Sequence, residues 1–537
     1  MTPEEAIRRQ KELESERSTW ASYWQDLASF CLPQKAFITS KKEGGQTPSM
    51  EKIFDNTAIR SLKIMSAGFH SHLTNPSSKW FEMDIKNRKL MEDKAVKIWL
   101  KDVEDEIFST LNSSNFDAVM QEFYQDNGCF GTGAIFEEED LKDRVRFTML
   151  PLGEIYIEED AQGRVNRIYR KFTYTALQAH ERWGNDAGES VKQAMKDKKY
   201  SKLIEILHWI ILRDKRVAGK EDNLNMAYES KWVEIKSAHL IFESGFDEFP
   251  VAVGRFMKKT GEKWGYSPAM DVLADIRMIN AEKKTLIRAA MKIVDPPGSI
   301  PSRGFMMPLN MNPSGLNYRN PQTEKDAYQA METKGNIPIG FEMIRDVKES
   351  IEEGFFVPLF KAFSQITKQM TIPEVQRRIA ENMVLLGPVV GRHTQEVLDP
   401  IIIRTFNILF KNGHFPPAPA VLAGQEFDVV YISQLAKAQR ASEILSLEKT
   451  LATVAEISQL VPSVLDKIDT DKAVDIIAEI NGTNPELIRD DKEVATIREI
   501  KQQIEEKREQ IEQAGQVAQT AETITRAEKN LKPTGAK

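Results

Sequence analysis

Two long helical patterns flank a segment rich in proline and glycine, and this arrangement constrains the fold more than any other feature of the chain. Pro268 opens an uninterrupted helical pattern that runs to about Val294 and predicts a helix about 40 Å long at ~1.5 Å per residue. Between Asp295 and Arg345 the chain contains seven prolines and five glycines, so only short strands are expected there. A second helical pattern resumes near Arg345, and Pro358 predicts a kink within it.

The chain before these helices changes character near Ala134. Upstream, Thr2 and Glu5 form a capping box with Pro3 at the first helical position, which predicts a long opening helix that ends before Pro33. Downstream, short runs typical of strands occur at 144–150, 164–172, 203–212, 232–242 and 250–257, with a turn signal at 160–163. The sequence therefore predicts a mixed α+β fold that is mainly helical.

The part of the chain after the second long helix is predicted to be helical again. A capping box opens at Thr371, Gly387-Pro388 predicts a break, and Asn412-Gly413 closes a later helix. Helices are expected, with a short strand at 427–432 between them, at 374–386, 388–411, 434–460 and from 463 onward. From about Asp490 the chain is dominated by Glu, Gln, Lys and Ala, which predicts a solvated helix that fades into a disordered tail.

Charge and cysteine content exclude several classes of protein. The chain has 73 Lys plus Arg against 80 Asp plus Glu, a net charge of −7, which argues against a broad nucleic-acid-gripping surface. Cys31 and Cys129 are the two cysteines, so no disulfide framework and no thiolate zinc site are predicted. No apolar run is long enough to span a bilayer, and the charged N-terminus lacks the order of a secretory signal. We expect the protein to stay in the reducing compartment where it is made.

Motifs for nucleotide or nucleophile chemistry are not found. The glycine-rich run at 128–133 follows a predicted helix and precedes a predicted strand, the reverse of a dinucleotide fingerprint, so a structural turn is expected. The sequence contains no Gly-x4-Gly-Lys-Ser/Thr and no Gly-x-Ser-x-Gly. Hydrolysis of ATP by the P-loop route is therefore not expected of this chain.

Histidines and clustered acids are the residue types that could form a metal or acid–base site. His70 with His72, and His393 with Glu396, are the best candidates, yet neither pair has an obvious third ligand. We therefore expect histidines of the core or of helix surfaces. The acidic run at 137–140 is expected to be a solvated turn, and no catalytic residue, metal or cofactor is predicted.

Four cations lie on the first long helix, and their role has two readings. They could face a DNA backbone, or they could pair with neighbouring acids or with the next subunit of an assembly. They are Lys283, Lys284, Arg288 and Lys292.

A series of short motifs resembles the head-to-tail connector, or portal, family of short-tailed bacteriophages over nearly the whole chain. The motifs occur in the family's order, at 76–81 (Pro-Ser-Ser-Lys-Trp-Phe), 131–133 (Gly-Thr-Gly), 264–269 (Trp-Gly-Tyr-Ser-Pro-Ala), 295–297 (Asp-Pro-Pro), 385–389 (Leu-Leu-Gly-Pro-Val), 413–416 (Gly-His-Phe-Pro) and 431–440 (Tyr-Ile-Ser-Gln-Leu-Ala-Lys-Ala-Gln-Arg). Pro373 and Lys437 depart from the family's usual residues, which affects the expected shape of local loops.

The resemblance implies a function without catalysis. Members form a ring, usually of twelve subunits, at one capsid vertex, through which double-stranded DNA is packaged and ejected. The implied partners are the terminase large subunit, the tail adaptor, and the major capsid and scaffolding proteins; the implied location is the virion, with assembly in the host cytoplasm. The alternatives are another structural phage ring protein, such as a tail adaptor, or a metal-dependent hydrolase.

The resemblance also implies a division of the chain and candidate contact residues. The implied parts are a wing at 1–266, a first stem helix at 267–294, a clip at 295–344, a second stem helix at 345–369, a tunnel-loop region at 364–373, a helical return at 374–433, a crown at 434–500 and a tail at 501–537 that is helical, disordered or a barrel. The tunnel loop would touch moving DNA through Lys368, Gln369, Met370, Thr371 and Ile372. The clip would dock partners through Arg303, Phe305, Met306 and Met307.

Overall fold

The computed structural model contains two compact units. The first comprises 1–83, 102–417 and 428–438, and the second comprises 84–101, 418–427 and 439–537. The structure describes residues 1–39, 50–87, 90–217, 220, 222–301, 310, 312–319, 329–330, 337–364, 386–422, 427–431, 447, 449–457, 469–480, 487, 489, 493–508 and 523–524. Among these residues, no helix combines the length and apolar character needed to cross a membrane.

The N-terminal part is helical, as predicted, but its first helix is divided in two. The predicted capping box forms: Glu5 N donates to Thr2 Oγ1 at 3.3 Å, and Thr2 N donates to Glu5 Oε2 at 2.9 Å. The division falls at Arg17, which is buried and donates to the carbonyls of Leu152 (2.8 Å) and Ile155 (2.6 Å). The helices are α1 (Pro3–Glu16), α2 (Ser18–Cys31), α3 (Thr57–Leu73), α4 (Lys94–Ser113) and α5 (Phe116–Phe130).

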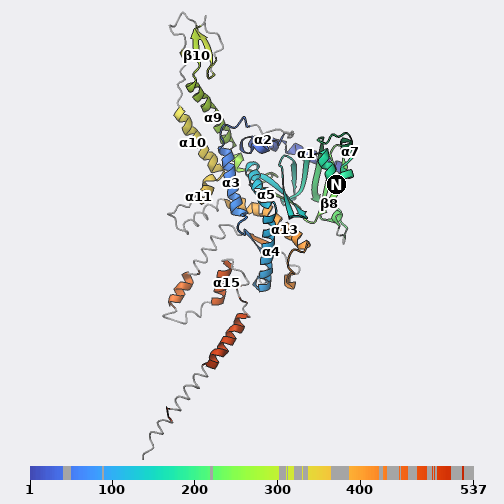
Figure 1. Ribbon diagram of the computed structural model, residues 1–537, viewed down its shortest axis with the longest axis vertical. Helices are drawn as coiled ribbons and strands as arrows, with labels where there is room; N and C mark the ends of the chain where they lie inside the picture. The colour runs from blue at the N-terminus through green and yellow to red at the C-terminus, as the bar shows by residue number, and fades with distance from the viewer. Residues whose placement is uncertain are drawn as a thin grey trace, which may run out of the picture. The chain divides into compact units, whose positions relative to one another are not determined.

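A five-stranded antiparallel sheet is the largest sheet among the described residues, and helices lie on both of its faces (Figure 1). Its strands, adjacent in chain order, are β4 (Ile155–Glu159), β5 (Val165–Thr175), β6 (Leu203–Leu212), β7 (Tyr228–Glu234) and β8 (His239–Phe246). Leu207 and Trp209 of β6 pack with Leu13 of α1, whereas Ile204 and Ile206 pack under α6 (Ala176–Trp183) and α7 (Glu189–Lys196). Burial on both faces explains why β6 is apolar without alternation.

A second sheet has three strands in the order β3 (Arg144–Leu150), β2 (Thr132–Asp140) and β9 (Val251–Arg255). Two sequence predictions about strands are wrong, one in this sheet and one in the five-stranded sheet. The acids from Glu137 to Asp140 belong to β2, paired with β3, and the turn follows them. The run predicted at 232–242 spans parts of β7 and β8, because the chain turns between them with Ala238 at φ 51°.

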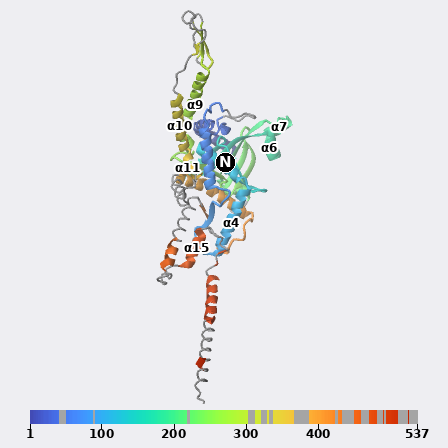
Figure 2. The same cartoon turned by 60° about the vertical axis from the view of Figure 1, so that its left-hand side comes forward.

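The two long helices form an antiparallel pair in both views of the chain (Figures 1 and 2). The first predicted helix is divided into α8 (Pro268–Asp271) and α9 (Leu273–Val294), and the second begins at Ile337, earlier than predicted, as α10 (Ile337–Gly354). A break at Phe356 (φ 57°) separates α10 from α11 (Val357–Ser364), so Pro358 starts a helix instead of kinking one. Between α9 and α10 lie three short strands, β10 (Gly298–Pro301), β11 (Leu316–Arg319) and β12 (Gln329–Ala330).

The later part of the first unit contains a described helix that begins at Leu386 and passes through a π-helical turn, Thr394–Leu398, into α13 (Asp399–Lys411). Gly413 follows at φ 69°, which agrees with the predicted end of this helix. Strands β1 (Phe81–Ile85) and β13 (Phe427–Tyr431) form a two-stranded sheet. Short 3-10 helices lie at Pro33–Lys35, Leu90–Glu92, Gly184–Ala187, Asn223–Asn225 and Ala420–Leu422.

Within the second unit, the described C-terminal segments are helical. They are 449–457, α15 (Thr470–Ile480) and 493–508. Arg498 pairs with both carboxylate oxygens of Asp471 at 2.6 and 2.7 Å. The mixed helix and strand character predicted from the sequence is confirmed.

Candidate functional site

Helices α9 and α10 pack through one apolar side of each. The buried apolar residues described on α10 are Ile344, Val347 and Ile351, and those on α9 are Leu273, Ile276 and Ile279. Two contacts fix the register between the helices. Ser350 Oγ donates to Asp275 Oδ2 at 2.7 Å, and a Cβ on Gly340 would lie 3.2 Å from Leu286 Cδ1. We call this pair, with its strands, the α9–α10 hairpin.

Among the four predicted cations of α9, Lys283 is held by an acid of its own chain. Its Nζ donates to Asp55 Oδ2 at 2.8 Å, and Lys348 Nζ lies 3.6 Å from the same oxygen. Asn280 Oδ1 positions this segment by accepting from the backbone N–H groups of Phe54 (2.7 Å) and Asp55 (3.0 Å). Burial raises the pKa of Asp55, but hydrogen bonds from Lys283 and Thr57 outweigh it and bring the pKa to about 2. The ion pair therefore persists at any physiological pH.

The other three cations are arranged differently. Lys284 is exposed, with its Nζ 5.2 Å from the centroid of the Phe54 ring. Arg288 is exposed and Lys292 is half-buried, and neither forms an ion pair within the described part of the chain. The structure thus separates Lys283, which is committed to Asp55, from cations that are available to another molecule.

The predicted tunnel-loop and clip residues lie outside the described residues. This applies to Lys368, Gln369, Met370, Thr371 and Ile372, and to Arg303, Phe305, Met306 and Met307. Their predicted contacts therefore remain predictions.

Two of the family-like motifs meet below the hairpin through backbone contact. Gly131 ends α5 at φ 77°, and a Cβ there would lie 2.3 Å from the carbonyl oxygen of Gly265. A Cβ on Gly265 would in turn lie 2.0 Å from the oxygen of Gly131, while Gly265 N donates to Thr132 Oγ1 at 2.9 Å. Only glycines allow the chains to approach this closely. The glycine-rich run is a structural turn, as predicted.

The last carbonyls of α5 are bonded by residues far away in the sequence. Ser267 Oγ donates to Cys129 O at 2.8 Å, and Trp24 Nε1 donates to Phe130 O at 3.1 Å. Phe256 N donates to Gly131 O at 2.9 Å. The end of α5 is therefore joined to α2, to β9 and to the residue that caps α8, so the base of the hairpin is fixed to the rest of the unit.

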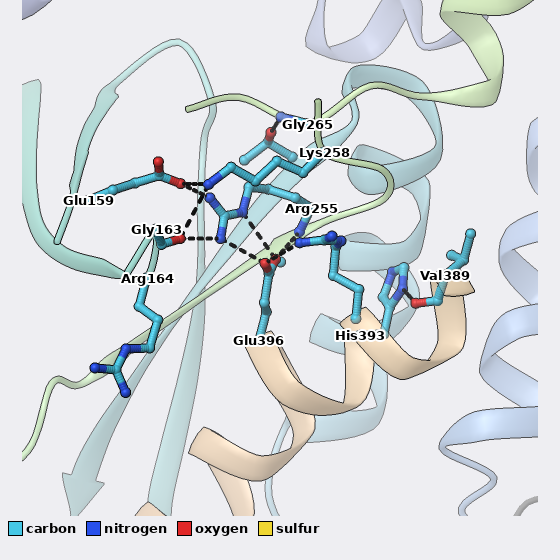
Figure 3. Close-up of polar contacts among 12 residues, drawn as sticks. Glu159, Gly163, Arg164, Arg255, Lys258, Gly265, Val389, His393 and Glu396 are labelled. Atoms are coloured by element: carbon cyan, nitrogen blue, oxygen red, sulfur yellow. Dashed lines mark hydrogen bonds and ion pairs between the residues drawn. The ribbon is translucent and has the colours of Figure 1, made fainter. Parts of the chain in front are cut away.

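A partly buried ion cluster lies beside this contact and is centred on the buried Arg255 of β9 (Figure 3). Glu396 accepts from Arg255 N (2.9 Å), Nε (3.1 Å) and Nη2 (2.6 Å), and also from Arg392 Nη1 at 3.0 Å. On its other side Arg255 pairs with Glu159 of β4, which also pairs with Lys258. We call these five side chains the Arg255 cluster. It joins both sheets to the π-helical turn.

The candidate residues His393 and Glu396 are directed to different partners. His393 is buried among the rings of Phe69, Phe123 and Phe256, its Nδ1 lies 2.8 Å from Val389 O, and burial lowers its pKa. Glu396, which the sequence placed beside His393, points to Arg255 instead (Figure 3). Over the described ranges, no three His, Cys, Asp or Glu side chains are grouped so that they could hold a metal ion.

One buried carboxyl was missed by sequence reasoning, because it lies in a run of acids. Glu137 is 1 % exposed and accepts from Thr405 Oγ1 at 2.8 Å. Arg404 Nε donates to the backbone oxygen of Glu137 at 3.2 Å. Burial raises the pKa of Glu137 to about 8 despite the nearby Arg404 charge. The carboxyl belongs to the contact between β2 and α13.

The comparisons with known proteins agree with the motifs. The model of the family described as bacteriophage head to tail connecting protein matches residues 3–488. The chain therefore belongs to the bacteriophage head-to-tail connecting protein family, and the family prediction made from the motifs is confirmed.

Two curated relatives have the more specific name of portal protein. The chain is 31% identical over 503 residues to the probable portal protein of Bordetella phage BPP-1, covering 91% of this chain and 89% of the relative. It is 29% identical over 531 residues to the portal protein of Salmonella phage epsilon15, covering 98% and 96%. A chain of the solved virion of a native gene transfer agent particle aligns at 10% identity with a TM-score of 0.36, over 75% of this chain and 88% of that one, which is too distant to support an argument.

Proposed function

We propose that this chain is a portal subunit that assembles as a ring at one capsid vertex, through which double-stranded DNA enters and leaves the phage head. The observation that carries the proposal is the match to the connecting-protein family over 3–488, together with two relatives named portal protein that align along nearly their whole length. The ring would contain twelve subunits. Its partners would be the terminase large subunit during packaging, the tail adaptor afterwards, and the major capsid and scaffolding proteins during assembly in the host cytoplasm.

The observed elements suggest how the parts of such a subunit are divided. Residues 1–266, with both sheets, would form the wing, and α9 and α10 would be the stem helices that cross the ring. The strands β10, β11 and β12 would belong to the clip, which would then end near Ile337, where α10 begins. Residues 374–433 would return to the wing, 434–500 would form the crown and 501–537 the tail.

The contacts to DNA and to partners are proposed for residues that project from this frame. The tunnel loop at 364–373, with Lys368 to Ile372, would touch passing DNA, and Arg303 and the residues at 305–307 would dock the motor and the adaptor. Lys292 of α9 is also a candidate for contact with DNA. A conduit must not hold its cargo, because each cation in contact with phosphate strengthens binding. The net charge of −7 fits a subunit that binds DNA weakly.

The proposed role requires no catalysis by this chain. The polar clusters described above join elements of the fold, and the family and its relatives have names that denote connection and not chemistry. Energy for DNA movement would come from a partner with its own nucleotide site.

The proposal is tested by the native mass of the purified protein and by negative-stain images. Twelve subunits of 61.2 kDa give about 734 kDa, and the images should show a ring with a central opening wide enough for duplex DNA. Monomers or dimers without rings at all protein concentrations would refute the proposal. Metal-dependent DNA cleavage by the pure protein that disappears on His393→Ala would favour the hydrolase alternative.

A further inference from the structure

Four exposed carboxylates follow one side of α10 and have no partner in the described chain. They are Glu342, Asp346, Glu349 and Glu353, and we call them the acidic row. Their spacings of four, three and four place them on one side of the helix, over a length of about 16 Å. No ion pair joins any of them to another described residue. Like charges at such spacings destabilise an isolated helix, and one exposed cation of α10, Arg345, which lies three residues from Glu342 and four from Glu349, offsets this in part.

A row of cations of the same length follows one side of α9. Arg277, Lys284 and Arg288 are exposed at spacings of seven and four, and we call them the basic row. Arg277 is held by Asp26, with Nη2 2.6 Å from Oδ2, whereas no carboxylate lies in contact with Lys284 or Arg288 in the described part of the chain.

The side chains beside the basic row are uncharged, and two of the three are alanines. Ala274, Met278 and Ala281 are exposed there, and Met278 keeps 43% of its surface in contact with solvent. Small side chains on a helix face permit another helix to approach closely, because the axis separation depends on the side chains at the contact.

The two rows do not face each other within one hairpin. Arg277 directly follows the buried Ile276, whereas Asp346 directly precedes the buried Val347. Each row is thus displaced by roughly a quarter turn or more from the side that joins the two helices. The basic row follows the joining side of α9 in chain direction, whereas the acidic row precedes the joining side of α10. Because the two helices are antiparallel, the two rows therefore lie on opposite faces of the hairpin.

The rows overlap in height along the hairpin. The contacts between Ser350 and Asp275, and between Gly340 and Leu286, place Lys284 level with Glu342 and Arg277 level with Glu349. The rows are offset by four residues, about 6 Å, because Glu353 lies beyond the level of Arg277 and Arg288 beyond the level of Glu342. For a hairpin that runs along the ring axis, rotation about that axis does not change the height of a residue. The acidic row of one copy would therefore meet the basic row of the next copy between Glu342 and Glu349, which is the condition for a head-to-tail contact that closes.

We infer that the occupant of both faces is a second copy of this chain: the acidic row of one α9–α10 hairpin docks on the basic row and the small apolar surface of its neighbour. The inference rests on the proposed ring and adds to it the residues that fix the order and register of the subunits. It assigns Lys284 and Arg288 to the neighbouring subunit and not to DNA. Complementary charges suit this role, because wrong registers bring like charges together.

Charge reversal with rescue tests the inference on the full-length protein, with the fraction of chains in rings measured by mass photometry at fixed concentration. Lys284→Glu with Arg288→Glu, and separately Glu342→Lys with Asp346→Lys, should each lower the ring fraction at least about tenfold, because either change opposes like charges at every interface. The chain with all four changes should form rings again, since the changed part of each row then again faces opposite charges across every interface.

The matched control is Lys196→Glu with Lys236→Glu, which makes the same charge change on exposed residues of α7 and of the loop after β7. This control should form rings like the unchanged protein. Normal rings from Lys284→Glu with Arg288→Glu would overturn the inference, and a DNA-packaging defect in those rings would assign the two cations to DNA. Failure of the fourfold variant to regain rings would overturn it too. No rings from the unchanged protein would refute the ring itself, and the interface with it.

Discussion

The Arg255 cluster and the outer faces of the α9–α10 hairpin use charge in opposite ways. In the cluster, Arg255 is 2% exposed and donates to two carboxylates and to two backbone oxygens. On the hairpin, the acidic row and two of the three cations of the basic row are exposed without an ion pair in the described chain. Charges that hold one subunit together are satisfied within it. Charged side chains of α9 and α10 that form no ion pair in the described chain indicate contacts with other subunits of an assembly.

The contrast between the Arg255 cluster and the hairpin predicts the largest loss of stability for a change at Arg255. Replacing Arg255 with Met removes the cation that the partly buried Glu159 and Glu396 share and leaves each with one cation, Lys258 and Arg392, and it should lower the free energy of unfolding by about 3–5 kcal/mol. Urea-induced unfolding measures this loss as the change in the free energy of the first unfolding transition. The exposed pair of Lys411 and Asp247 offers a control, and Lys411→Met should change stability by about 0.5 kcal/mol or less. Equal losses at the two sites would contradict the distinction.

The glycine contact beside the cluster should give the next largest effect. Gly131→Ala forces a Cβ to within 2.3 Å of the Gly265 oxygen at φ 77°, and should cost about 3 kcal/mol or more. Gly261→Ala is the matched control, because it has φ 87° but no atom within 4 Å, so backbone strain alone should cost about 1 kcal/mol. Thermal unfolding of both variants measures the difference. Equal costs would mean that the close approach is not what fixes this position.

The pH dependence of stability tests whether buried charge in the fold is fully compensated. The pKa of Glu137 is raised to about 8 from 4.5, so the folded state holds a proton that the unfolded state releases. Stability from this group is complete below about pH 4.5 and is lost as pH rises through 8, by about 2 kcal/mol between pH 6 and 8. Glu137→Gln should remove that part of the slope in urea unfolding measured across this range. An unchanged slope would show that Glu137 is ionised in the fold.

The smallest effect is expected on the hairpin. Lys284→Ala with Arg288→Ala should change the stability of dissociated subunits by about 0.5 kcal/mol or less, because neither side chain forms an ion pair within the described chain. Thermal unfolding at protein concentrations too low for assembly measures it. A loss comparable to that at Arg255 would show that these cations serve the fold after all.

Sequence reasoning succeeded where one local signal decides the outcome. The bounds of β3 and β6 match the predicted runs at 144–150 and 203–212, the capping box of Thr2 and Glu5 forms, and Gly413 ends its helix. Strongly patterned segments between clear turn residues need little tertiary information.

Sequence reasoning failed where residues far apart in the chain determine the local structure. Glu137 reads as part of a solvated turn until Thr405, far along the chain, supplies its partner. Arg17 divides the opening helix because its guanidinium binds carbonyls of the 152–155 segment, and no helical pattern encodes that. Pro338 and Gly340 suggested a loop, so the start of α10 at Ile337 was not predicted. In the structure Pro338 lies in the first turn, where a helix tolerates proline, and Gly340 packs against α9. The pairing of Glu396 with Arg255 instead of His393 also depends on packing alone.

The π-helical turn Thr394–Leu398 carries Glu396 and so sets the phase between the two ends of one long helical segment. A π turn accommodates an extra residue relative to an α-helix. Because the wider turn takes up that residue, the α-helical parts on its two sides keep the phase of one continuous helix. Deleting one residue within the π turn would therefore leave α13 in phase with the preceding helix, with Arg404 and Thr405 still facing Glu137. Deleting one residue from the first turn of α13 would instead rotate the residues after it by about 100° and turn them away from Glu137.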